Sequence, residues 1–535
     1  MATEITEFLS ESPREPDDSG WLTPWRNPVR LVELVCLLLL VALCDVTIYS
    51  GGGFSGYAVL FTAAPVMLYF GVARRTADVS ARILAPMLLI LAARLTWCGD
   101  WLGVATGFAL LAALAMALTG LRPYVLELIV FAAQTIPAGF LAFCQYAAAG
   151  SRVQGPSQKR NWLAVAIPGA AFFVFSLLFL LANPDLLSWV NDGLSRAFET
   201  ARVWLAEFAP TPLRVLFWIA VAWISAGLLR PLLGMTRALL DDVDTPVPPA
   251  PESAPAPLYE AFRNMLVVVT GLFGVYLVYE FTSVWSREFP PGSYSAYAHE
   301  GAFWLTVALA VSTVILSGVF QGRVLADPRL RMLRRWSRVW AVENFLLAVT
   351  VYHRMFIYVE FNGMTRMRVV GLLGITAVVA GFVLVLVKIA KSRSFLWLIR
   401  RDLWALGFFV YLYVVLPVDL VVMRYNVRRI MEGDPAPSVQ ISVHPINAEG
   451  FLTLSPLLES DDPVIREGVR AMLSERLEKL NLREDQASNW TTYQLADEQL
   501  HTQLSGKRSQ LNRFPDATQR RAARKAFDRY AYQWY

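Results

Sequence analysis

The stretch LGVATGFALLAALAMALTG, residues 102–120, decides the fold class of this chain. It carries no charged side chain, and a helix that crosses the hydrocarbon core of a bilayer needs about 20 mostly apolar residues. Inside lipid, every backbone N–H and C=O group must find a partner within the protein, and an α-helix satisfies all of them within one segment. The stretch therefore predicts a membrane-spanning helix.

Composition extends this prediction to most of the chain. Of its 535 residues, 56% are hydrophobic and 17% are charged, whereas soluble globular proteins have about 25% charged residues. No segment alternates apolar and polar residues with a period of two, as the strands of a transmembrane barrel do. We expect an all-α, polytopic integral membrane helix bundle of about 11–12 transmembrane helices. The candidate spans are 29–49, 54–73, 81–98, 102–120, 123–147, 161–182, 211–233, 260–285, 301–320, 340–358, 369–390 and 403–423.

Changes in composition divide the chain into parts. The polar tail has apolar residues at helical spacing, which predicts a small helical soluble domain. A solvated extension and a specific docking module are both open for this tail. In chain order, the expected parts are an acidic N-terminal tail (1–28), the first membrane helices (29–148), further membrane helices (161–240) with an interfacial amphipathic helix (186–208), a proline-rich linker (241–257), a second membrane region (258–430) and the helical soluble tail (431–535).

Loop charges predict an orientation. By the positive-inside rule, loops rich in Lys and Arg are cytoplasmic, which places the tail on the opposite side of the membrane. An earlier loop is also predicted to be cytoplasmic, because it carries Arg74, Arg75 and Arg82. However, an odd number of candidate spans separates this loop from the basic loop 149–160. Either one of the first five segments does not cross fully, or one loop departs from the rule. The basic loops are 149–160, 230–259, 321–339 and 388–402.

Sequence motifs for catalysis and metal binding are absent. The chain has 4 histidines and no HExxH, GxSxG, P-loop or GxGxxG pattern, and no Cys/His group has the spacing of a zinc site. We therefore assign no catalytic residue, no cofactor and no metal, and we favour a protein that is not an enzyme. The net charge of +5 lies mainly in short loops, which does not favour nucleic acid as a partner.

A polar stripe marks the tenth candidate span. Glu343, Thr350, Arg354 and Tyr358 follow at intervals of seven, four and four residues, so they share one face of a helix. Ionisable groups within membrane helices are costly and often functional. Three interpretations are open: hydrogen bonds that hold helices together, a substrate or ion path, and charged side chains that reach the interface.

Several motifs occur together in the second half of the chain. The segment YHRMFIYVEFNGMTRMRV (352–369) has an Arg one turn before a Tyr and then Gly-x-Thr-Arg-x-Arg. Together with further motifs it resembles the bacterial multi-pass membrane family catalogued as domain of unknown function 4173, related to family 4153. The resemblance covers roughly residues 160–505 and implies candidate positions rather than an activity. Those positions are Asp185, Tyr297, Gly301, Arg354, Tyr358, Gly363, Thr365, Arg366, Arg368, Arg424, Tyr425 and Asn426.

The Gly-x-Thr-Arg-x-Arg motif predicts a turn between two spans. Gly363 tolerates the positive φ that a tight turn requires, and Thr365 is a good N-cap for the following helix. Arg366 and Arg368 then fall in the first turn, where the helix dipole disfavours cations. We expect one arginine to pair within the protein, with Glu360 as the nearest acid in sequence, and the other to be available to an anionic group.

Two hypotheses of function follow. The first is a non-enzymatic scaffold, signalling or envelope-associated protein that presents its helical tail to a protein partner. The alternative is a transporter or lipid-handling protein with a polar path lined by Glu343 and Arg354. A stripe sealed by neighbouring helices favours the first hypothesis, and a stripe that faces a water-filled cavity favours the second. Both place the chain in a bacterial cytoplasmic (inner) membrane, in contact with the lipid bilayer and possible anionic lipid head groups.

Overall fold

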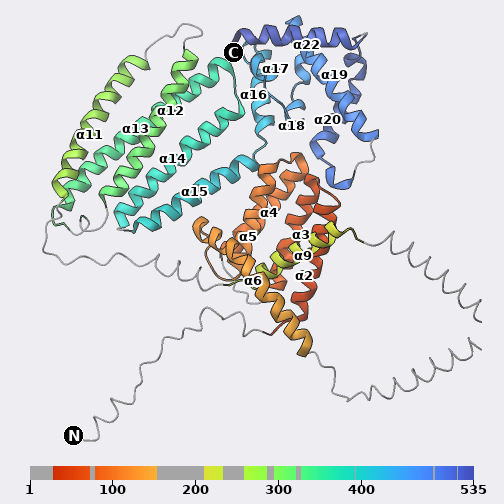
Figure 1. Cartoon of the computed structure of the whole chain (residues 1–535). Coiled ribbons are helices and arrows are strands. Elements are labelled where there is room, and N and C mark those ends of the chain that lie inside the picture. The colour runs from red at the N-terminus through yellow and green to blue at the C-terminus, as the bar shows by residue number, and fades with distance from the viewer. Residues whose placement is uncertain are drawn as a thin grey trace, which may run out of the picture.

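A computed structural model of the chain describes a wholly helical molecule over the residues it covers. Every described element is a helix, as expected for a polytopic helical bundle. Figure 1 shows two groups of membrane helices with a third, C-terminal group of shorter helices at one end of both. The described residues are 28–72, 79–152, 210–232, 236, 258–285, 294–320, 324, 327–391, 393–485, 489–514 and 516–534.

The first bundle contains the N-terminal membrane helices. Polar side chains fix where several of them start: Asp100 accepts a hydrogen bond from the Gly103 N–H at 2.6 Å, and Thr211 accepts one from Arg214 at 3.3 Å. Leucine, alanine and aromatic side chains then fill most of the core. The elements are α2 (Leu31–Cys44) with its continuation η2 (Asp45–Tyr49), α3 (Phe54–Gly71), α4 (Val79–Cys98), α5 (Trp101–Leu118), α6 (Val125–Arg152) and α9 (Pro212–Leu229).

The second bundle is a layer of long helices beside the first. Helix α13 lies against α11, α12 and α14, and Trp340 and Phe382 are fully buried where these helices pack. The elements are α11 (Tyr259–Tyr279) with η3 (Glu280–Val284), α12 (Tyr294–Val319), α13 (Leu330–Asn362), α14 (Arg366–Lys391) and α15 (Phe395–Val415).

A bend separates the membrane helices from the C-terminal domain. Helix α15 ends at Val415, because Pro417 disfavours helical backbone at Leu416, and α16 continues at an angle of 63°. Helix α16 contributes Val422 and Val427 to the core of the C-terminal domain. The last predicted span, 403–423, therefore runs across this bend. The domain consists of α16 (Val418–Met431), α17 (Ser438–Ser442), α18 (Ala448–Phe451), η5 (Ser455–Glu459), α19 (Pro463–Asp485), η6 (Trp490–Thr492), α20 (Leu495–Gly506), α21 (Arg508–Leu511), α22 (Ala517–Ala531) and η7 (Tyr532–Trp534).

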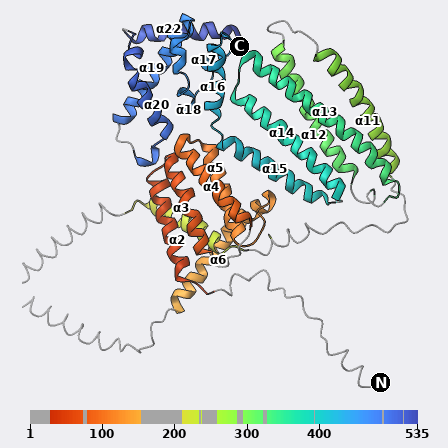
Figure 2. The ribbon, with the colours of Figure 1, turned by 180° about the vertical axis from the view of Figure 1, so that it is seen from behind.

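The C-terminal domain is docked on the ends of the membrane helices. Trp97 of α4 and Met364, just before α14, pack against its hydrophobic core. The Asn489 side chain donates to the carbonyl of Ser50 at 2.8 Å, and the Gln494 side chain accepts from the Gly99 N–H at 2.5 Å. Figures 1 and 2 show the domain above α3, α4 and α5 in both views. The tail therefore packs on the membrane helices of its own chain, and its use as a docking module for a partner stays a prediction.

Helix length and hydropathy support a multi-pass membrane protein. Within the described residues, 9 helices are long and apolar enough to cross a membrane, or 10 if the bent pair α15–α16 is one span. The tenth predicted span lies inside α13, which is not among them. The predicted span 161–182, the amphipathic helix 186–208 and the linker 241–257 lie outside the described residues.

The contacts of helix α6 bear on the odd number of candidate spans between the first two basic loops. Glu127 near its start pairs with Arg400 of α15, and Tyr146 near its end donates to Glu33 of α2 at 2.6 Å. Both partner helices begin at the end of the molecule away from the C-terminal domain, because both run toward that domain. The two ends of α6 therefore lie on one side, and α6 lies obliquely across the bundle (Figure 1). By length and composition α6 is one of the 9 candidate spans, so it stays a prediction that, of the first five segments, this one does not cross fully.

Candidate functional site

The turn between α13 and α14 has the predicted geometry. Gly363 has φ of 83°, which side chains other than glycine rarely adopt. The Thr365 hydroxyl accepts a hydrogen bond from the Arg368 N–H at 3.1 Å, which caps α14. Both predictions for this turn are confirmed.

Asn426 holds the turn against α16. Its side-chain oxygen accepts from the Met364 N–H at 2.7 Å, and its side-chain amide donates to the Met364 carbonyl at 2.9 Å. A β-carbon on Gly363 would lie 2.6 Å from the same oxygen. The glycine is therefore required both by its φ angle and by the close approach of Asn426.

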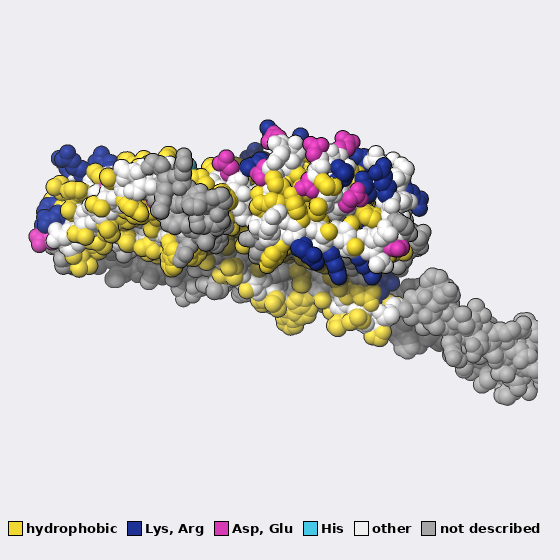
Figure 3. Space-filling view, turned by 90° about the horizontal axis from the view of Figure 1, so that it is seen from above, with side chains coloured by type: hydrophobic (Ala, Val, Ile, Leu, Met, Phe, Trp, Pro, Cys, Tyr) yellow, Lys and Arg dark blue, Asp and Glu magenta, His cyan; other side chains and the backbone are white. Residues whose placement is uncertain are grey.

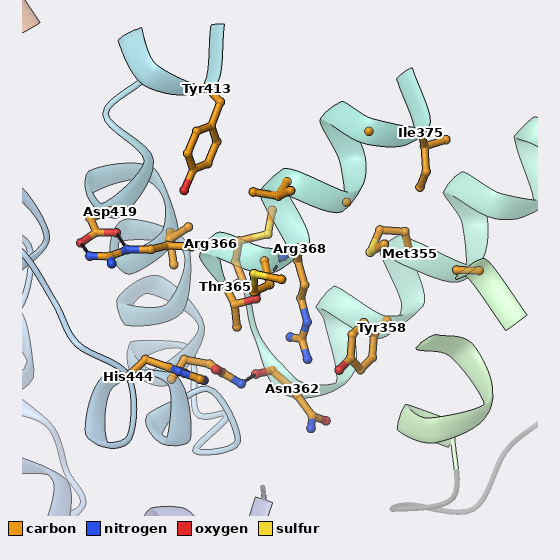
Figure 4. Close-up of a pocket in the computed structure, with 18 of the residues that line it drawn as sticks. Met355, Tyr358, Asn362, Thr365, Arg366, Arg368, Ile375, Tyr413, Asp419 and His444 are labelled. Carbon is orange, nitrogen blue, oxygen red and sulfur yellow. Dashed lines mark hydrogen bonds and ion pairs between the residues drawn. The ribbon is translucent and has the colours of Figure 1, made fainter. Parts of the chain in front are cut away.

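The two arginines of the motif leave α14 in different directions (Figure 4). Arg366 forms a bidentate ion pair with Asp419 of α16, whose carboxylate also accepts from the Asn447 N–H at 2.9 Å. Arg366 is thus the arginine that pairs within the protein. Its partner is Asp419 and not Glu360, whose main-chain carbonyl accepts a hydrogen bond from Arg429 at 3.0 Å.

Arg368 has no carboxylate partner among the described residues. Its guanidinium donates to the Gly363 carbonyl and lies 3.8 Å from the centre of the Tyr358 ring. The residue is only 5% exposed. Removing a cation from water costs several kcal/mol unless an anion or several hydrogen bonds offset it, so this position favours a negative group nearby.

A cavity of about 860 Å³ lies beside Arg368. Helices α12, α13 and α14 form one part of its wall, and the C-terminal domain supplies Gln440, His444 and Trp534. Burial and then the cations Arg368 and Arg366 lower the pKa of His444. The cavity therefore joins an apolar region between membrane helices to a polar, positively charged end.

The polar stripe on α13 is largely sealed. Arg354 forms a bidentate ion pair with Glu280 at 2.8 and 2.6 Å, and the carboxylate is completely buried. Gly301 of α12 makes this possible, because a β-carbon there would overlap the guanidinium. Thr350 is buried and donates to the Leu347 carbonyl at 2.8 Å.

The two ends of the stripe differ from its centre. Glu343 lies beside Gly274 of α11, and one of its carboxylate oxygens is buried without a hydrogen-bond partner. Tyr358 at the other end borders the cavity. Only this end of the stripe therefore reaches the site around Arg368.

Of the remaining predicted positions, Arg424 and Tyr425 do not line the cavity. Arg424 is exposed on α16, and the Tyr425 hydroxyl accepts from Arg429 at 3.2 Å. Tyr297 lies in α12, but its side chain is outside the described part of the chain, as is Asp185 entirely. Among the described residues, no group of three or more His, Cys, Asp or Glu side chains could hold a metal ion.

One polar connection between the domain and the first bundle was not predicted. Glu449 of α18 is fully buried, accepts from Arg94 at 3.0 Å and accepts from the Trp97 indole at 3.1 Å. Burial raises the pKa of Glu449, and Arg94 opposes this rise. Arg94 is a charged residue within the predicted span 81–98, whereas no local sequence pattern marks its partner, which is 355 residues away.

The fold and the site define a multi-pass helical membrane protein with a docked C-terminal domain. A family model described as domain of unknown function (DUF4153) matches residues 79–448, which is more than half of the chain. The chain belongs to this family, the relative of family 4173 to which the motifs had pointed. No curated protein and no solved structure matches the sequence.

Proposed function

We propose that this protein is a non-enzymatic scaffold of a bacterial cytoplasmic membrane, which holds its C-terminal domain in a fixed position for a protein partner. The observation that carries the proposal is the docking of that domain through buried polar contacts such as Glu449 with Arg94. A domain that only extended into solvent would not need a buried ion pair, whose formation requires both charges to leave water.

The outer helix of the domain supplies a candidate partner surface. Arg521, Lys525 and Arg529 repeat every four residues on α22 and are exposed, so they form one basic stripe. Arg520 on the inner side of the same helix instead pairs with Glu478 at 2.7 Å. Figure 3 shows charged side chains over this domain beside the largely hydrophobic surface of the second bundle. The basic stripe favours a partner with an acidic surface.

The transport hypothesis receives less support from the same residues. Arg354, one of the two groups assigned to a polar path, is paired with Glu280 and is sealed by α12. A stripe sealed by neighbouring helices is what a structural role predicts. The unpaired carboxylate oxygen of Glu343 does not by itself make a path, since Thr350 between the two charges is completely buried.

Affinity capture in mild detergent tests the scaffold proposal. The wild-type chain is compared with Arg521→Gln/Lys525→Gln/Arg529→Gln and with a matched control, Arg331→Gln/Arg335→Gln/Arg338→Gln, which removes three exposed charges at the far end of α13. We expect a protein that co-purifies with the wild type and the control but is depleted several-fold in the α22 variant. Identical captured proteins in all three samples would refute the role of this surface.

A further inference from the structure

The cavity beside Arg368 has a positively charged end, and the proposed scaffold function does not explain why a cation is buried there. Arg368 is only 5% exposed, and its partners are the Gly363 carbonyl and the side chain of Tyr358, through the ring and a hydrogen bond. Neither cancels a full positive charge. Arg366, two residues earlier, is neutralised by Asp419, so the excess charge in this region belongs to Arg368.

A second buried polar side chain belongs to the wall of the same cavity. Gln440 of α17 lines the cavity and is 5% exposed. Its amide nitrogen donates to the Asn362 carbonyl at 2.8 Å, whereas its side-chain oxygen has no hydrogen-bond partner. A ligand that offers a negative group to Arg368 and a hydroxyl or ammonium donor to Gln440 would satisfy both.

The part of the cavity between α12 and α14 is largely apolar, and two of its side chains lie at the outer surface of these helices. Phe303 of α12 and Met367 of α14 line it and are 56% and 76% exposed. Gly374 of α14 also lines the cavity and is exposed, and no atom lies within 4 Å of where its β-carbon would be. An acyl chain fits an apolar channel of this kind, whereas a free anion would leave it empty.

We propose that this cavity binds an anionic phospholipid, with the phosphate on Arg368, a head-group hydroxyl or ammonium on Gln440, and an acyl chain between α12 and α14 beside Gly374. Arginine binds phosphate oxygens bidentately, and basic pockets between membrane helices bind lipid head groups. The position suits this ligand, since the polar end lies where membrane helices meet the C-terminal domain. The proposal is independent of the partner surface on α22.

Native mass spectrometry of the full-length, delipidated protein tests the site. Phosphatidylglycerol, phosphatidylcholine and inorganic phosphate are added separately to the wild type and three variants. Arg368→Gln removes the cation, and Gly374→Leu fills the apolar channel without displacing any atom within 4 Å of the new β-carbon. Gly407→Leu is the matched control, because Gly407 is also an open position on a membrane helix but does not line the cavity. Size-exclusion profiles establish that each variant is folded.

We expect one phosphatidylglycerol to be retained by the wild type and by Gly407→Leu. Retention should fall roughly tenfold or more in Arg368→Gln, since a charge-assisted contact is lost, and it should also fall in Gly374→Leu. If Arg368→Gln does not fold, Gly374→Leu alone decides. Equal retention in wild type and Gly374→Leu would overturn the proposal, as would equal retention of phosphatidylcholine. Displacement of the lipid by inorganic phosphate would assign the site to a free anion instead.

Discussion

At the scale of single residues, Gly363 carries two separate constraints. These are its φ of 83° and its close approach to Asn426. Gly433 has only the first constraint, since its φ is 99° and the space around it is open, so a comparison of the two glycines separates the two stability costs. We expect Gly433→Ala to cost about 1–2 kcal/mol from backbone strain alone. Gly363→Ala should cost about 3 kcal/mol or more, because Asn426 must also move. Apparent Tm values in detergent measure both, and equal losses would show that Asn426 does not constrain the turn.

Arg354 is expected to be structural. Replacing it by Gln leaves Glu280 buried without its ion-pair partner, and such a change costs about 3–5 kcal/mol. Arg424→Gln is the control, since Arg424 is exposed on α16 and its loss should change stability by less than about 0.5 kcal/mol. Thermal unfolding of both variants checks this prediction. A stable Arg354→Gln protein that had lost a transport activity would instead favour the polar path.

His444 should make stability depend on pH. Burial and the two nearby arginines hold its pKa below the ordinary value of 6.5, so the unfolded chain binds more protons than the folded chain as the pH falls through that value. Stability should therefore decrease from pH 7.5 to 5.5, and His444→Gln should remove part of the decrease. Unfolding midpoints at both pH values test this. An unchanged pH dependence in the variant would contradict the role of His444.

Sequence reasoning at this scale found the residues that act locally. The conformations of Gly363 and Thr365 follow from the chemistry of a turn and a helix cap. Partners from distant segments could not be found in the same way. Asp419 is 53 residues from Arg366 and Glu280 is 74 residues from Arg354, and only the packing of whole helices brings them together.

At the scale of elements, α18 is a short helix that connects the domain to the first bundle. Glu449→Gln leaves Arg94 without its carboxylate at a site that is closed to water. We expect a loss of about 3 kcal/mol and faster hydrogen exchange in η6 and α20, which contact α3 and α4. The control is Glu475→Gln, whose exposed pair with Lys479 contributes less than about 1 kcal/mol. Equal exchange in the two variants would show that Glu449 does not hold the domain in place.

The elements were largely predictable, and their placement was not. Runs of apolar residues give the positions of the membrane helices, because about 20 such residues are needed to cross a bilayer. The same criterion admits α6, whose two ends contact helices on one side of the bundle. Hydropathy indicates whether a segment can lie in lipid. The orientation of α6 in the bundle instead follows from its buried contacts with Arg400, through Glu127, and with Glu33, through Tyr146.

At the scale of the whole molecule, the basic segments and the C-terminal domain lie at opposite ends. Helix α13 begins with several arginines and ends at Asn362, whose side chain donates to the carbonyl of Trp534 at 3.2 Å. At 1.5 Å per residue, a helix of 33 residues is about 50 Å long, which exceeds the thickness of the hydrocarbon core. The positive-inside rule then predicts that the basic end is cytoplasmic and the domain is outside.

Cysteine labelling of intact cells tests this arrangement most directly. In a background with the four native cysteines replaced by serine, single cysteines are placed at Arg331 and at Lys479, which are both exposed. A membrane-impermeant maleimide should label Lys479→Cys in intact spheroplasts, and Arg331→Cys only after the membrane is opened. Labelling of both positions from the same side would contradict the central claim, that the membrane helices carry the C-terminal domain on the side opposite their basic ends.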